Sequence, residues 1–168
     1  MPKANFVCVL LILLACSDGT GPGTDGPLSL SARLDGRPWT PDYGSNLLST
    51  RRPDGYLFVG AIRRYSLGGP ARDAIGVQIV GFTGPGRYVF TGDPVGTTGV
   101  YALYDSATGG STNFYSHAPN TGEVTVTELD TVAHRVAGRF SFSAGEEGGT
   151  RAVRVEGGVF RVEYTMAH

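Results

Sequence analysis

Cysteine and lysine are nearly absent from this sequence, and both are confined to its start. The 168 residues include two cysteines, Cys8 and Cys16, and a single lysine, Lys3. From residue 17 onward there is no thiol, which excludes a disulfide framework and a zinc site with cysteine ligands. The absence of lysine from the same stretch excludes any mechanism that depends on a catalytic lysine.

Histidine is scarce as well, and the charges are nearly balanced. The three histidines, His117, His134 and His168, are scattered, and there is no G-x-S-x-G motif, so neither a hydrolytic triad nor a histidine metal cluster is indicated. After residue 16 there are 13 arginines and 15 acids, a balance that gives no electrostatic case for binding nucleic acid. The sequence therefore predicts no catalytic residue, no cofactor, no metal and no nucleic-acid partner.

The only adjacent acids are Glu146 and Glu147, and glycines flank them on both sides. Glycoside hydrolysis uses two carboxyl groups held at a defined separation. A glycine-rich segment does not hold side chains rigidly, so we expect this pair to form a solvated loop tip.

Long apolar runs are also missing, because the longest candidate, residues 6–14, has about half of the 20 residues that a membrane-spanning helix needs. It follows a short positive start and ends in Leu13-Leu14-Ala15-Cys16. This pattern resembles a bacterial lipoprotein signal, in which the cysteine receives diacylglycerol. Leu13 suits that signal better than an ordinary secretory cleavage site, which prefers small residues.

The resemblance implies three parts and a location. Residues 1–15 would be a signal peptide, residues 16–27 a lipidated tether rich in Gly, Pro and Asp, and residues 28–168 a single domain. Cys16 would be the lipid attachment site, and the membrane would be contacted through the lipid. We expect a lipid-anchored protein of the bacterial cell envelope, and Ser17 after the cysteine points to the outer membrane in a cell that has one.

Glycine is abundant, with 26 in 168 residues, about twice its usual share. The glycines separate many short apolar runs, a pattern typical of all-β domains. We predict an all-β, antiparallel β-sandwich of eight to eleven short strands with little or no helix. A partly open β-barrel is the alternative.

The C-terminal third has the clearest alternation of apolar and polar residues. Its inward-facing set changes parity at Gly157-Gly158, after Val155 and before Phe160. Either a two-residue hairpin or a β-bulge in one long strand explains the change. The bulge is slightly favoured, because a hairpin would set Arg154 opposite Arg161.

Five short motifs follow one another along residues 28–168. They are Ala32-x-Leu34-Asp35-Gly36-x-x-Trp39, Gly86-x-Tyr88, Gly122-x-Val124-x-Val126, Val136-x-Gly138-x-Phe140-x-Phe142, and Gly158-x-Phe160-x-Val162-x-Tyr164. Together they resemble a widespread family of bacterial lipoproteins of unknown function. The resemblance implies an all-β domain behind a lipid anchor and brings no catalytic residues with it.

One segment could carry a ligand site, because residues 101–120 gather aromatic, acidic and amide side chains around a flexible loop. They are Tyr101, Tyr104, Asp105, Phe114, Tyr115, His117 and Asn120. Such rings can form a platform for a sugar or a peptide, or they can simply fill the core of the sandwich.

The predicted function is a non-enzymatic envelope lipoprotein, structural or ligand-binding, whose partner could be a glycan or an envelope protein. The alternative is a carbohydrate-binding or carbohydrate-degrading accessory lipoprotein. The oligomeric state is left open.

Overall fold

The structure is a computed structural model that describes residues 26–42, 47–93, 95–117, 119 and 121–167. These residues form twelve strands and no helix, and hence contain no helix able to cross a bilayer. The strands are β1 (Ser29–Leu34), β2 (Arg37–Trp39), β3 (Leu47–Arg52), β4 (Tyr56–Arg64), β5 (Ala71–Val80), β6 (Gly86–Val89), β7 (Thr98–Tyr104), β8 (Ser111–Tyr115), β9 (Gly122–Asp130), β10 (Arg135–Glu146), β11 (Ala152–Glu163) and β12 (Thr165–Met166). The all-β prediction is confirmed, with one strand more than the eight to eleven expected.

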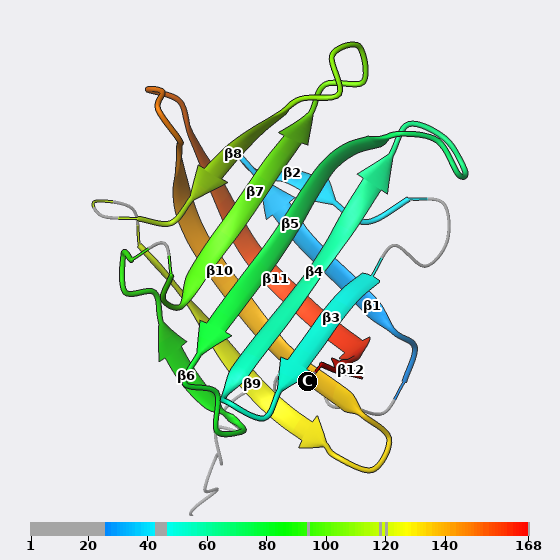
Figure 1. Cartoon of the computed structure of the whole chain (residues 1–168), viewed down its shortest axis with the longest axis vertical. Helices are drawn as coiled ribbons and strands as arrows, with labels where there is room; N and C mark the ends of the chain where they lie inside the picture. The colour runs from blue at the N-terminus through cyan, green and yellow to red at the C-terminus, as the bar shows by residue number, and fades with distance from the viewer. Residues whose placement is uncertain (1–25, 43–46, 94, 118, 120, 168) are drawn as a thin grey trace, which may run out of the picture.

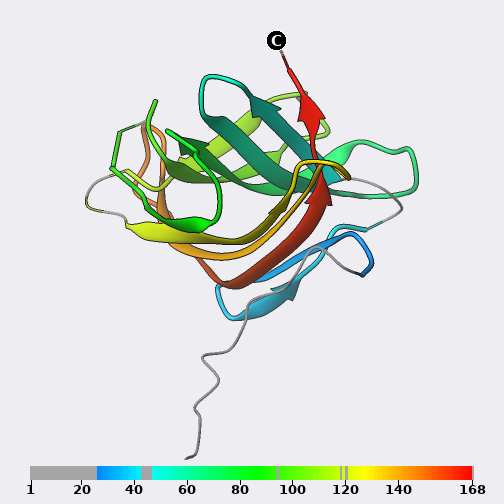
Figure 2. The same ribbon diagram turned by 90° about the horizontal axis from the view of Figure 1, so that it is seen from below.

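The strands belong to one sheet that folds over into two facing layers (Figures 1 and 2). One layer contains β3, β4, β5, β7 and β8, and the other contains β2, β1, β11, β10, β9 and β6. Strand β10 joins them, because its first part pairs with β9 whereas Gly145 and Glu146 at its end pair with Tyr115 and Phe114 of β8. The pairing is antiparallel except between β12 and β3, which are parallel, so the predicted antiparallel sandwich is observed with one parallel pair.

Period-two alternation places the core between the layers. In β10, Val136, Phe140 and Phe142 are buried, while Arg139 and Ser141 point to solvent, as the sequence pattern predicts. Burial of such side chains, contributed by both layers, supplies the main stabilising free energy of a domain that has no thiol.

The parity change at Gly157-Gly158 is a β-bulge, which confirms the favoured alternative. Strand β11 runs through both glycines, and its pairing with β10 steps from Phe140↔Gly158 to Phe142↔Val155. Gly157 has a φ of +56°, a conformation that side chains other than glycine rarely adopt. The extra residue returns Val155 and Phe160 to the same buried face.

The first hairpin closes one edge of the sheet. Asp35 and Gly36 both have positive φ, 48° and 77°, the conformation of a tight two-residue turn. Strand β2 lies at the end of the strand order, which suits Pro38 because it lacks an N–H group. The turn places Trp39 on the inner side of the sheet, where its side chain is completely buried.

Candidate functional site

The residues of the predicted aromatic platform lie in two different environments, some in the core and some at the surface. Tyr101 on β7 and Phe114 on β8 are only 4% and 1% exposed, and their ring centroids are 5.5 Å apart. Both belong to the core and present no ring face to a ligand, so they cannot be platform residues. Tyr104 is half-buried at the end of β7, and Asn120 lies outside the described residues.

Asp105, also in that segment, shapes a loop. Its carboxylate accepts hydrogen bonds from the Ala107 amide at 2.9 Å and from the Thr108 hydroxyl at 2.7 Å. The hydroxyl and the amide lower the pKa of Asp105. The side chain is therefore engaged within the β7–β8 turn.

Tyr115 and His117 are the two predicted residues that form an accessible aromatic surface. Alternation along the end of β8 buries Phe114 and Ser116 and leaves Tyr115 and His117 partly exposed on the same side. Their rings stack with centroids 5.1 Å apart and planes 6° from parallel.

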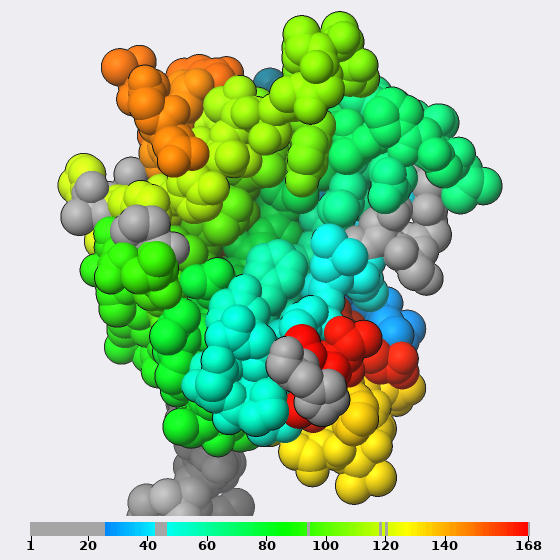
Figure 3. Space-filling model, in the orientation of Figure 1, coloured from blue at the N-terminus to red at the C-terminus, as the bar shows by residue number. Residues whose placement is uncertain are grey.

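The loop between β10 and β11 stands opposite this stacked pair. Figure 3 shows the orange hairpin projecting at one corner of the molecule, beside the yellow-green residues of β8. Tyr115, His117 and Pro119 on one side and residues 145–152 on the other enclose a cleft of about 470 Å³, which we call the hairpin cleft. Its size falls within the range of small-ligand sites.

Backbone hydrogen bonds fix the hairpin beside β8. The Glu147 amide donates to the Asn113 carbonyl at 2.9 Å, and the Glu146 amide donates to the Arg151 carbonyl at 2.9 Å. Residues 147–150 at the tip are exposed, as predicted for a solvated loop, and the loop is anchored at its base to the neighbouring strand.

The charged side chains of the hairpin differ in whether they form ion pairs. Arg151 donates to both oxygens of Glu146 at 2.6 and 2.8 Å, which lowers the pKa of Glu146. Arg151 also lies over the Phe114 ring, 5.4 Å from its centroid. The side chain of Glu147 makes no hydrogen bond or ion pair with any described residue.

Two further features concern the Tyr115 and His117 side chains that line the hairpin cleft. Burial, and after it the negative charge of Glu147, raises the pKa of Tyr115. The Nε2 atom of His117 is buried without a hydrogen-bond partner among the described residues. A buried polar atom without a partner costs about 1–3 kcal/mol.

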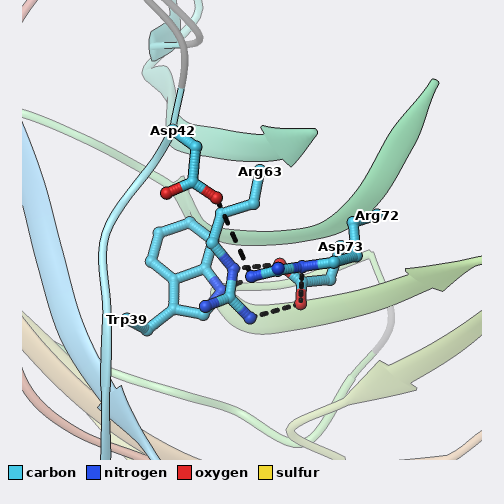
Figure 4. A network of polar contacts seen from close by, with 5 residues as sticks. All are labelled: Trp39, Asp42, Arg63, Arg72 and Asp73. Carbon is cyan, nitrogen blue, oxygen red and sulfur yellow. Dashed lines mark hydrogen bonds and ion pairs between the residues drawn. The ribbon is translucent and has the colours of Figure 1, made fainter. Parts of the chain in front are cut away.

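A second polar cluster, missed by sequence reasoning, surrounds Asp73 at the start of β5 (Figure 4). The carboxylate is 3% exposed and accepts from Trp39 Nε1 at 2.9 Å, from Arg63 Nε at 2.7 Å and from Arg63 Nη2 at 2.5 Å. Arg72 approaches it at 3.7 Å and also reaches Asp42 at 3.8 Å. These contacts tie β2 to β4 and β5, so we assign Asp73 a structural role.

Asp73 is the one fully buried acid among the residues that the structure describes. Within the same residues no group of three or more His, Cys, Asp and Glu side chains is placed to hold a metal ion. A glycosidase-like pair would need two carboxyl groups facing one bond, and in the hairpin cleft Arg151 engages Glu146.

Raising the pH from 10 to 12 is expected to destabilise the domain through Tyr101. Burial, and after it the charge of Asp73, raises the pKa of Tyr101 from 10.0 to about 12. Since the folded state holds this proton more tightly, the stabilisation is complete below pH 10 and is lost as the pH rises through 12. Its size is on the order of 2 kcal/mol.

Urea unfolding at several pH values between 9 and 12 tests this expectation. The Tyr101→Phe variant should lose stability less steeply than the parent over this interval. Parallel curves for the two proteins would contradict the assignment to Tyr101.

The sequence was also compared with known proteins. Residues 31–162 match the family model described as Domain of unknown function (DUF6252). Neither the curated proteins nor the solved structures include a significant match.

Proposed function

The chain belongs to the DUF6252 family, and we propose that this member is a ligand-binding lipoprotein of the bacterial cell envelope that holds a saccharide in the hairpin cleft. The match covers most of the all-β domain and leaves out the segment that resembles a lipoprotein signal. The proposal therefore joins an anchor inferred from residues 1–16 to a binding site inferred from the geometry of β8, β10 and β11.

The observation that carries the binding proposal is the partly exposed Tyr115–His117 stack opposite a glycine-rich hairpin. A saccharide presents C–H groups on one face of its ring and hydroxyl groups around the edge. The stacked rings suit the C–H face, and the backbone of residues 145–150 and the Glu147 carboxylate offer hydrogen bonds to hydroxyls.

The position of the hairpin cleft supports a role at a distance from the anchor. Ser29, at the beginning of β1, pairs with Arg161, whereas the cleft lies at the opposite end of β11, beside Ala152. Nine residues of strand at about 3.3 Å each separate the two points by roughly 30 Å. In Figure 1 β1 accordingly begins at the lower right and the orange β10–β11 hairpin lies at the upper left.

The Tyr115→Ala variant should lose saccharide binding while remaining folded. Removal of the ring deletes one face of the stack but no core side chain, because Tyr115 lies on the outer side of β8. We expect at least a tenfold weaker affinity, about 1.4 kcal/mol, with an unchanged melting temperature. The measurement is binding of the full-length protein, in detergent micelles, to an array of soluble oligosaccharides.

Tyr104→Ala is the matched control, since Tyr104 is a half-buried tyrosine of the same segment that does not line the hairpin cleft. It should bind like the parent. The proposal fails if the parent binds no saccharide, or if Tyr115→Ala binds as tightly as the parent.

A further inference from the structure

We infer that the saccharide preferred by the hairpin cleft carries a protonated amine, as a non-acetylated hexosamine does, and that Glu147 selects it. This inference rests on the proposed function, because it concerns the same cleft.

The hairpin cleft has one uncompensated negative charge. Glu146 and Arg151 neutralise each other through two hydrogen bonds, at 2.8 and 2.6 Å. Glu147 is the remaining charged lining residue whose formal charge is fixed at neutral pH, and its carboxylate has no partner among the described residues. An anionic ligand would be repelled by this charge, a neutral ligand would leave it unused, and a cation would pair with it.

Glu147 lines the hairpin cleft and is exposed. Its amide is bonded to the Asn113 carbonyl at 2.9 Å, which fixes the residue beside β8. The charge lies close enough to Tyr115 to raise the pKa of that phenol, although burial contributes more. Gly148 follows with a φ of +72° and has only open space where a side chain would stand.

The aromatic wall favours the same ligand charge. The face of a tyrosine ring attracts a cation within about 6 Å of its centroid, with a larger effect where water is partly excluded. An ammonium group on a saccharide stacked at Tyr115 would meet both the ring and the Glu147 carboxylate. A neutral saccharide would keep the stacking and the hydroxyl contacts but would gain neither attraction, so Glu147 and the Tyr115 ring together discriminate between the two ligands.

Calorimetric titration of the full-length protein in detergent tests the inference, with glucosamine oligomers and N-acetylglucosamine oligomers of equal length as ligands. Mildly acidic pH keeps the amine protonated and the carboxylate charged. The parent should bind the amine oligomer at least tenfold more tightly. Glu147→Gln should reduce this preference several-fold, leaving only the smaller contribution of the Tyr115 ring, and should leave the affinity for the acetylated oligomer unchanged.

Two further variants separate this inference from the proposed function. Glu163→Gln, an exposed acid at the far end of β11, should keep the preference for the amine oligomer. Tyr115→Ala should weaken the binding of both oligomers. The inference is overturned if the parent binds both oligomers equally, if it binds neither, or if Glu147→Gln retains the parent's preference undiminished. The proposed function still stands in those cases provided that Tyr115→Ala abolishes binding to some saccharide of the array.

Discussion

Replacement of Asp73 by asparagine is expected to lower the free energy of unfolding by roughly 3–5 kcal/mol. Asparagine keeps the shape of the side chain but removes the charge that faces the Arg63 guanidinium. The Arg63 side chain is 16% exposed and lies 5.1 Å from the centre of the Trp39 ring, so water can compensate little of the lost attraction. A buried cation would remain without its anion, which is the costly result of breaking a buried ion pair.

Urea unfolding followed by circular dichroism measures the effect. Asp54→Asn is the matched control, because Asp54 also pairs with an arginine, Arg52, but both side chains are about half exposed. Exposed pairs contribute little, so this variant should unfold at the parent's urea concentration. Equal midpoints for the parent and Asp73→Asn would show that the cluster does not stabilise the fold.

A double variant distinguishes lost charge pairing from lost packing. Asp73→Asn combined with Arg63→Gln removes both charges and leaves two amides of similar length at the same place. If the isolated charge is the main cost, the double variant should be more stable than Asp73→Asn alone. If the double variant is instead less stable than the parent by the sum of the losses measured for Asp73→Asn and Arg63→Gln separately, the two side chains act independently.

The sequence predicts much of the fold because its signals there are local. Alternation at Val136, Phe140 and Phe142 identifies the buried face of β10, and the parity change at Gly157-Gly158 identifies the bulge. Both patterns depend only on residues a few positions apart, since neighbouring side chains of a strand point to opposite faces.

The cluster at Asp73 could not be predicted in the same way. Asp73 meets Trp39 across 34 residues and Arg63 across 10, through the approach of β2 to the β4–β5 pair. In a chain with 14 basic residues and 15 acidic residues, nothing in the local sequence specifies which arginine will neutralise which acid.

Only one wall of the candidate site could be predicted from the sequence, for the same reason. Composition singled out residues 101–120, but burial of Phe114 and exposure of Tyr115 depend on which face of β8 meets the core. The opposite wall of the hairpin cleft comes from residues about 30 positions later, placed there by the pairing of Gly145 with Tyr115. The glycines around Glu146 and Glu147 predict a loop, but not the strand beside which that loop lies.

Cys16→Ser is expected to abolish attachment of the protein to the membrane. Cys16 lies outside the described residues, so this expectation rests on the resemblance to a lipoprotein signal. Each buried CH₂ of an acyl chain contributes about 0.8 kcal/mol, and one chain binds only marginally whereas two or more bind stably. Without the thiol no diacylglyceryl group can be attached, and no other membrane contact is proposed for the chain.

Fractionation of cells that express the parent, Cys16→Ser or Cys8→Ser tests the anchor. The parent and Cys8→Ser should sediment with membranes, because Cys8 belongs to the apolar run that we expect to be removed with the signal. Cys16→Ser should be soluble or remain unprocessed, and a fully processed Cys16→Ser protein in the membrane pellet would contradict the assignment. Since the hairpin cleft lies roughly 30 Å from the start of the domain, released Cys16→Ser protein should bind saccharides with the parent's affinity, which makes anchoring and binding separable.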